Sequence, residues 1–406
     1  MLTQILIVLK VSVKKLYNEC SIINEAFEKG IPISLINLLT SIPVELHAHI
    51  VDCFRHINEE TYKKGNVLCR DDQSLLHLIQ LSVIPNIVES IKTQNNFITN
   101  LSIFKIFLKF YIRENEDERN QQFFHECFQI ILPVIYTVLN SEELNEFTAK
   151  SAKLSAQLLF NLVDSGLILF VESFTEEMTL SMISHYSQYF TTLFSISSSL
   201  NRHLLRLNCF LFNSYYGNDT LLNSVVPFFF QSSISILSNQ ELNFSDIYLQ
   251  TWALKLLYHL MDPTNRLPDG FDYCQFIKTI LIPFAAITDE EASDILSMPY
   301  LISSYYIFDD DNPSSSPRRE MCRKLGSILF RDPNLFSIVL QPDPSNSAFF
   351  ESCIFLVSCV DNFSSLVPYE MIDFILSANF PDYPPLIQAS FLYLLNRFAK
   401  HIKECN

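Results

Sequence analysis

Apolar residues recur along this chain at the spacing of an amphipathic helix. In the stretches from Leu249 to Leu260 and from Ile387 to Phe398 they fall three and four positions apart, which places them on one helical face. Alternating apolar and polar runs, which are typical of half-buried strands, are few. The pattern therefore predicts an all-α chain whose helices each bury one broad face.

The predicted helices come in pairs. In five places an apolar segment contains a proline between branched or aromatic residues, and a second amphipathic helix follows after a short polar turn. These prolines are Pro85, Pro133, Pro227, Pro283 and Pro368. The second helices are expected at 96–112, 143–163, 246–261, 299–308 and 384–398. Similar pairs without an internal proline are expected at 33–39 with 44–57 and at 178–194 with 200–216, whereas segments 319–330 and 349–360 interrupt the alternation.

A two-helix unit of about 40 to 47 residues is the period of HEAT and armadillo repeats. A single pair cannot bury its own apolar face, so such units stack against their neighbours into a superhelix. We therefore expect one HEAT-like solenoid over residues 1–406, an α–α superhelix, with an acidic, Ser- and Pro-rich loop at 309–319. A non-repetitive helical bundle is the competing interpretation.

Composition narrows the function. Only six glycines occur in 406 residues, and they are too far apart to build a Gly-rich phosphate loop, a dinucleotide fingerprint or a Gly-x-Ser-x-Gly turn. The formal net charge of −16 argues against direct nucleic-acid binding, which needs a basic face. Lysines interrupt the most apolar segments, so we expect no membrane insertion. Ten scattered cysteines without a Cys-x-x-Cys pair favour reduced thiols.

Residues that can carry chemistry are sparse. His49, Cys53 and His56 share one helical stripe, but no second Cys or His cluster completes a zinc site, and Ile50 and Phe54 mark a packing face there. We predict no metal, no cofactor and no catalytic residue, and hence a protein that is not an enzyme. The alternative to this prediction is an enzyme with an all-helical fold.

Acidic clusters are expected at the turns between helices, at 114–118, 289–291 and 309–311. Together with the negative net charge they predict an acidic surface that attracts basic protein cargo. An arginine pair follows the last cluster. The charged residues that we take as candidates for partner binding are Asp289, Glu290, Glu291, Asp309, Asp310, Asp311, Arg318 and Arg319.

The segment 271–331 resembles the importin-β superfamily of nuclear transport receptors, or karyopherins, nearest the branch of importin seven, importin eight and the importin-α exportin. The resemblance lies in a proline-containing helix, a Thr with an acidic stretch, a Pro-led helix, an acidic Ser-rich insert and a helix with basic residues at its start. The corresponding residues are Pro283, Thr288, 289–291, Pro299 with Tyr300, 309–316, and Arg318 with Arg319. We expect a divergent member without most of the N-terminal repeats that bind Ran.

The resemblance implies a HEAT-repeat, armadillo-like receptor that carries protein cargo between the cytoplasm and the nucleus. It also implies Ran and the Phe-Gly repeats of nucleoporins as further partners. The alternative function is a HEAT-repeat scaffold of another kind, such as a phosphatase regulatory subunit or a vesicle-coat component, because a fold does not fix a function.

Overall fold

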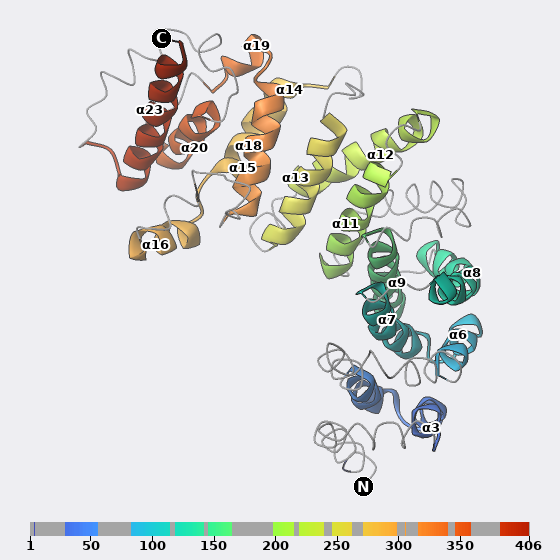
Figure 1. Cartoon of the computed structure of the whole chain (residues 1–406). Coiled ribbons are helices and arrows are strands. Elements are labelled where there is room, and N and C mark those ends of the chain that lie inside the picture. The colour runs from blue at the N-terminus through green and yellow to red at the C-terminus, as the bar shows by residue number, and fades with distance from the viewer. Residues whose placement is uncertain are drawn as a thin grey trace. The chain divides into compact units, whose positions relative to one another are not determined.

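The computed structural model describes residue 4 and residues 29–55, 83–113, 118–141, 145–164, 198–214, 219–238, 246–261, 271–298, 305, 316–339, 346–358 and 382–405. Within these ranges every regular element is a helix and none is a strand, which confirms the predicted all-α class (Figure 1). The chain divides into two compact units. Unit 1 comprises Met1–Tyr186 with Ser195–Phe210, and unit 2 comprises Ser187–Phe194 with Leu211–Asn406.

Unit 1 is built from successive helices. Its described helices are α3 (Ile31–Leu38), the short η2 (Val44–Leu46) with helical residues 47–55, α6 (Ile84–Lys92), α7 (Phe97–Arg113), α8 (Glu118–Leu139), α9 (Glu146–Asp164) and the part of α11 (Ser198–Ser214) up to Phe210. Most begin and end within three residues of the expected bounds, because the apolar spacing that predicts them is long and regular.

The central helices of unit 1 form two layers (Figure 1). The turn between α6 and α7 is closed by Gln94 and Asn96, whose left-handed φ values are 57° and 47°, and it brings α7 back against α6. In the same way α9 packs on α8, while α6 contacts α8 and α7 contacts α9. Two helix pairs therefore lie side by side, one layer formed by α6 and α8 and the other by α7 and α9.

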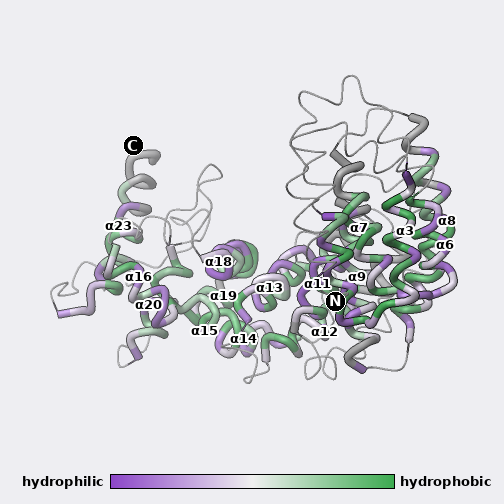
Figure 2. Tube along the Cα trace, turned by 90° about the horizontal axis from the view of Figure 1, so that it is seen from below, coloured by the Kyte–Doolittle hydropathy of each residue, from purple (hydrophilic) through white to green (hydrophobic). Residues whose placement is uncertain are grey.

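The interior between these layers is aromatic. Phe104 of α7 and Phe124 and Phe128 of α8 are at most 2% exposed. The ring of Phe128 meets that of Phe104 edge-on, with centroids 5.9 Å apart, and the Phe124 ring lies 6.2 Å from Phe104. In Figure 2, apolar and polar residues succeed one another along α7, α8 and α9, as expected of helices that bury one face.

Unit 2 is also built from helices, one of which is interrupted. Its described elements are α12 (Asp219–Ser238), α13 (Ile247–Met261), α14 (Tyr273–Phe276), η5 (Ile277–Leu281), α15 (Ile282–Ala285), α16 (Asp289–Ser297), α18 (Pro317–Leu329), α19 (Pro333–Phe336), α20 (Ser347–Ser358) and α23 (Pro385–Cys405). Helix α13 packs on α12 and α18, α15 packs on α18 and α20, and α20 packs on α23.

Elements α14, η5 and α15 form one continuous helical rod with a π-helical turn in its middle. The π turn at Ile277–Leu281 lies directly before Pro283, whose missing N–H removes one intrahelical hydrogen bond. A π turn is a common way for a helix to accommodate such a break. The rod ends at Ala286, whose backbone is extended, and its last carbonyl groups are left for other partners.

Two of the sequence expectations need correction in unit 2. Pro317 to Arg319, predicted to lie in the 309–319 loop, form the first turn of α18 instead. The acidic triplet 289–291, predicted at a turn, forms the first turn of α16. In both cases the residue type favours a helix start, proline at the first position and acidic residues near the positive end of the dipole. The predicted helices at 178–194 and 299–308 fall outside the described residues, except for Tyr305.

Helix α8 contains a window that is long and apolar enough to cross a membrane by length and composition. Among the described residues, the window Gln122–Leu139 has the required length and composition, with a mean hydropathy of 1.3. Its residues Phe128, Ile131 and Ile135 are fully buried against the rest of unit 1. A core helix of a soluble protein passes the same test, so the window alone does not establish a membrane span.

Candidate functional site

The charged segment singled out by the sequence begins at a capped helix. Thr288 is the N-cap of α16: the backbone N–H of Glu291 donates to Thr288 Oγ1 at 3.2 Å, and the Thr288 N–H donates to Glu291 Oε2 at 2.9 Å. This reciprocal capping box satisfies two backbone donors that a helix start leaves open. It also turns the Glu291 carboxylate inward, whereas the neighbouring Asp289 and Glu290 are exposed.

Arg318 reaches this carboxylate from the first turn of α18. Its Nη2 lies 2.9 Å from Glu291 Oε2 and also donates to the Ala286 carbonyl at 2.7 Å, while Nη1 donates to the carbonyl of Phe284. The hydroxyl of Ser316 donates to the other carboxylate oxygen of Glu291 at 2.5 Å. One guanidinium group therefore joins the end of α15, the start of α16 and the start of α18.

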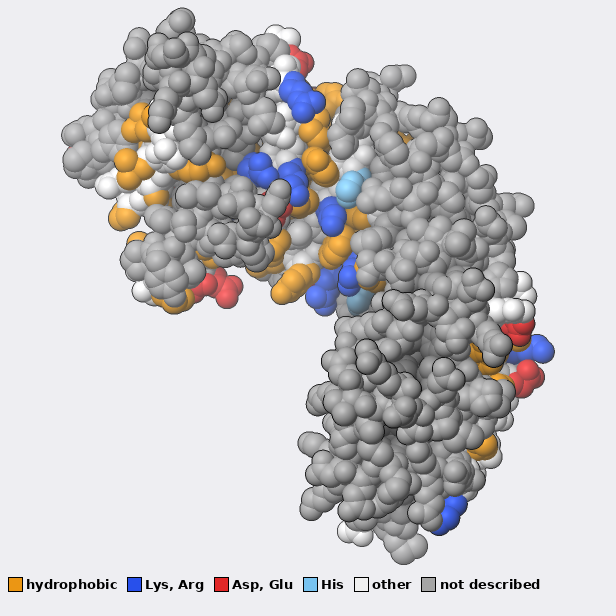
Figure 3. Space-filling model, viewed as in Figure 1, with side chains coloured by type: hydrophobic (Ala, Val, Ile, Leu, Met, Phe, Trp, Pro, Cys, Tyr) orange, Lys and Arg blue, Asp and Glu red, His pale blue; other side chains and the backbone are white. Residues whose placement is uncertain are grey.

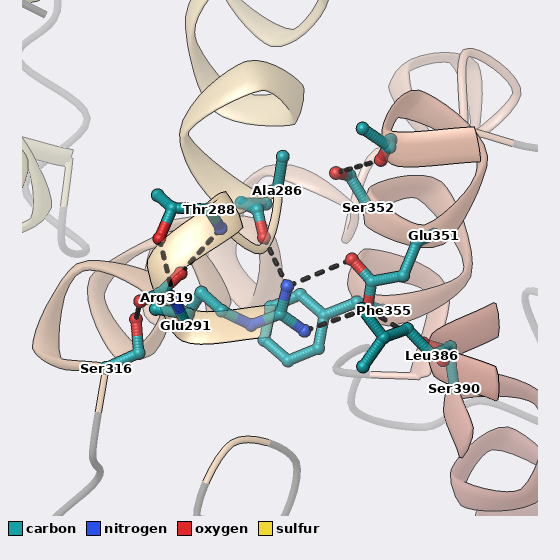
Figure 4. Close-up of polar contacts among 12 residues, drawn as sticks. Ala286, Thr288, Glu291, Ser316, Arg319, Glu351, Ser352, Phe355, Leu386 and Ser390 are labelled. Atoms are coloured by element: carbon teal, nitrogen blue, oxygen red, sulfur yellow. Dashed lines mark hydrogen bonds and ion pairs between the residues drawn. The ribbon is translucent and has the colours of Figure 1, made fainter. Parts of the chain in front are cut away.

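Arg319, the next residue, points toward α20 (Figure 4). Its two terminal nitrogens bind both oxygens of Glu351, at 3.0 and 3.1 Å, and Nη1 also donates to the Ala285 carbonyl. The Ser390 hydroxyl of α23 donates to the same carboxylate at 2.7 Å, and the guanidinium lies 3.8 Å from the centre of the Phe355 ring. Arg319 is 0% and Glu351 3% exposed, so this ion pair is buried.

The two arginines provide hydrogen-bond donors for the carbonyl groups at the end of a helix. The carbonyl groups of residues 284, 285 and 286 sit at the C-terminal end of the α14–α15 rod, where the intrahelical donors run out. Cationic side chains are favoured at this negative end of the helix dipole. We call the set formed by Arg318, Arg319, Glu291, Glu351 and Ser390 the arginine clasp, because it fastens five helices of unit 2 to one another.

The clasp makes the stability of unit 2 depend on pH. Burial raises the pKa of Glu291, but Arg318, the Ser316 hydroxyl and the Thr288 N–H outweigh it and hold that pKa below its ordinary value of 4.5. The stabilising contribution of the carboxylate is therefore present above about pH 4.5 and is lost as the pH falls through the lower folded pKa. We expect the urea midpoint, followed by Trp252 fluorescence, to fall on acidification below that pH.

The Glu291→Gln variant isolates this effect. Glutamine keeps the capping-box geometry but carries no charge. At neutral pH the variant should be less stable than the parent chain, and the difference should shrink as the pH falls below about 4.5. A stability difference that stays constant over the whole acid range contradicts the assignment.

The structure separates the candidate residues into three groups. Asp289 and Glu290 are exposed on α16, where a partner can reach them. Glu291, Arg318 and Arg319 direct their charged groups inward, so we assign them an internal structural role. Asp309, Asp310 and Asp311 lie outside the described residues. The sequence reasoning missed Glu351, although a lone acidic residue inside the apolar segment SAFFESCIFLVS is a signal of a buried partner.

The thiols and histidines of the described residues do not converge on a reactive centre. Burial, followed by the charges of Glu126 and Glu351 respectively, raises the pKa of Cys127 and of Cys353 to about 12, so both thiols stay protonated at neutral pH. Cys53 is buried, and His56 lies outside the described residues. No group of three or more potential metal ligands occurs in the part of the chain that the structure describes.

Glu291, Arg318 and Arg319 are therefore engaged in ion pairs inside unit 2. The exposed acidic residues of α16 are the part of the candidate site that a partner can reach. In comparisons with known proteins, no family model matches this chain and no curated protein has a significantly similar sequence.

Proposed function

We propose that this chain is a non-catalytic, protein-binding helical-repeat solenoid that works as a karyopherin-like receptor for protein cargo between the cytoplasm and the nucleus. The observation that carries the proposal is the layered packing of successive helix pairs in unit 1, α6 with α7 beside α8 with α9. Stacked pairs of this kind expose long faces of adjacent helices, and repeat proteins use such faces to bind partners. The resemblance of residues 271–331 supports the choice of transport.

The direct test is binding of the purified chain to Ran and to nucleoporins. We expect Ran in its GTP state, and peptides with Phe-Gly repeats, to be retained by the immobilised chain, and Ran in its GDP state to be retained less. Recovery of a stable phosphatase or vesicle-coat complex from cell extract, without Ran or nucleoporins, would contradict transport and support a scaffold of the alternative kind.

The exposed acidic residues of α16 provide a second test, aimed at the predicted basic cargo. Neutralising the two at its start, in the double variant Asp289→Asn with Glu290→Gln, should weaken binding of a basic peptide by about threefold to tenfold at low salt, and much less at high salt. The matched control is Glu45→Gln with Glu89→Gln, which removes the same charge from exposed positions in unit 1. Equal losses in both variants would show that only net charge matters.

A further inference from the structure

Basic residues are concentrated on one set of helices. Helices α7, α9, α11 and α13 together carry eight Lys or Arg and only two Asp or Glu, and both acidic residues are the terminal residues of α9. The whole chain, by contrast, has 28 Lys or Arg and 44 Asp or Glu. An acidic protein therefore carries a local excess of positive charge on these second helices, and α18, with four Arg or Lys and one Glu, is a further basic helix.

In unit 1 these residues meet across three neighbouring helices. Lys105 Nζ of α7 donates to Gln157 Oε1 of α9, and Gln157 Nε2 lies 2.6 Å from His203 Nε2 of α11. Since the amide nitrogen donates, the imidazole nitrogen accepts, and His203 is neutral with its proton on Nδ1. Arg206 of α11 also joins α9, because its guanidinium lies 3.6 Å from the centre of the Phe160 ring.

The local potential at this junction is positive. Burial and four neighbouring cations lower the pKa of His203 to about 4. The cations are Lys153, Lys105, Arg206 and Arg202. All four side chains are half-buried, so their charges are held near the helix surface and remain partly accessible. We call Lys105, Lys153, Arg202, His203 and Arg206 the basic cluster.

We propose that the basic cluster of α7, α9 and α11 is a docking surface for an extended, Asp- and Glu-rich segment of a partner protein. Charge complementarity carries the inference, since the cluster is cationic while the rest of the chain is strongly acidic. The inference rests on the protein-binding part of the proposed function but not on transport. It adds an acidic partner to the basic cargo expected at the exposed carboxylates.

The extent of the cluster favours a peptide over a compact anion. Neighbouring packed helices lie about 8 to 10 Å apart, so charges on three successive helices spread over roughly 16 to 20 Å. An extended peptide rises about 3.3 Å per residue, and about six residues therefore cover that span. A long nucleic acid is disfavoured, because its phosphates would also meet the acidic remainder of the chain.

Basic residues also gather on neighbouring helices of unit 2, so the basic cluster is not the only place where they do so among the described residues. Lys255 of α13 lies 4.8 Å from the centre of the Trp252 ring, and the packed helix α18 contributes Arg323 and Lys324. On the face of unit 2 that Figure 3 displays, Lys and Arg side chains lie among hydrophobic ones. There, however, Lys324 pairs with Glu320 at 2.9 Å, so the stronger candidate is the cluster of unit 1.

The test measures binding of a fluorescein-labelled peptide of about ten alternating Glu and Asp residues to the full-length chain, by anisotropy. We expect salt-dependent binding that Lys153→Glu weakens by about tenfold, equivalent to 1.4 kcal/mol. The control Lys92→Glu makes the same charge change on an exposed residue of α6 and should alter binding less than about twofold. Circular dichroism checks folding, and Lys153→Gln replaces Lys153→Glu if that variant unfolds.

A second readout places the peptide at the cluster. A bound carboxylate near His203 favours the imidazolium form, so the His203 pKa, followed by NMR with His203→Asn for assignment, should rise when the peptide binds. Three results would overturn the inference: no peptide binding, equal losses in Lys92→Glu and Lys153→Glu, or binding of inositol hexakisphosphate or single-stranded DNA in preference to the peptide. Failure to bind Ran would overturn transport and leave the peptide result standing.

Discussion

Replacing Arg319 with methionine is expected to lower the free energy of unfolding by about 3 to 5 kcal/mol, since removal of one partner leaves a buried charge uncompensated. In the parent chain Glu351 is 3% exposed and receives both terminal nitrogens of Arg319. Methionine fills a comparable volume beside Phe355 but donates no hydrogen bond. Urea unfolding followed by the fluorescence of Trp252, the single tryptophan of the chain, measures the loss.

A double variant separates the effect of the ion pair on stability from the effect of the packing around it. Arg319→Met combined with Glu351→Met removes both charges, and we expect the double variant to be more stable than either single variant. The control Lys324→Met breaks a half-exposed pair with Glu320 on the same helix and should cost no more than about 1 kcal/mol. If Arg319→Met costs no more than this control, the clasp does not stabilise unit 2.

Helix positions could be predicted from the sequence because they depend on a local pattern. The expected second helices at 96–112, 143–163 and 246–261 correspond to α7, α9 and α13, each built on a sustained apolar period. Helix starts depend on terminal chemistry rather than on apolar spacing. The sequence Thr288-Asp-Glu-Glu291 is a capping-box pattern and begins α16, and Pro317 is a typical first helical residue and begins α18, although neither segment has the apolar period of a helix.

The direction of charged side chains could not be predicted in this way. Arg318 and Arg319 are adjacent in a polar segment and look solvent-exposed. The end of the rod, however, offers three carbonyl groups: Arg318 donates to those of residues 284 and 286, and Arg319 donates to that of residue 285. Their acidic partners lie 27 and 32 residues away in the chain, and no local spacing indicates those pairs. The residues on which the resemblance rests therefore include a set that the fold brings into contact.

The sequence shows which helical segments are basic, but only the fold shows which of these segments are neighbours. The segment 247–261 contains Lys255 and no acidic residue, and 97–113 contains three basic residues and no acidic one. Counting charge over the whole chain gives −16 and predicts basic partners. Once α7, α9 and α11 are known to be neighbours, the same residues indicate a local cationic surface, which a net charge cannot represent.

Truncating Phe104 to alanine is the second change with a large expected effect, in the core of unit 1. Phe104 is fully buried between Phe124 and Phe128, and Phe→Ala in such a site loses the buried ring surface and leaves a cavity. We expect a loss of about 3 to 5 kcal/mol in the free energy of unfolding, measured by far-UV circular dichroism in urea.

Two control variants test whether the loss of stability in Phe104→Ala comes from the cavity or whether any substitution of an aromatic residue in unit 1 has the same effect. Phe104→Leu keeps most of the apolar volume and should cost less than about 1.5 kcal/mol. Phe123→Ala removes the same number of atoms from α8, but that ring is only half-buried, so the loss should be clearly smaller than for Phe104. Because α6 with α7 and α8 with α9 share this aromatic interior, equal costs at Phe123 and Phe104 would contradict the layered packing on which the repeat interpretation depends.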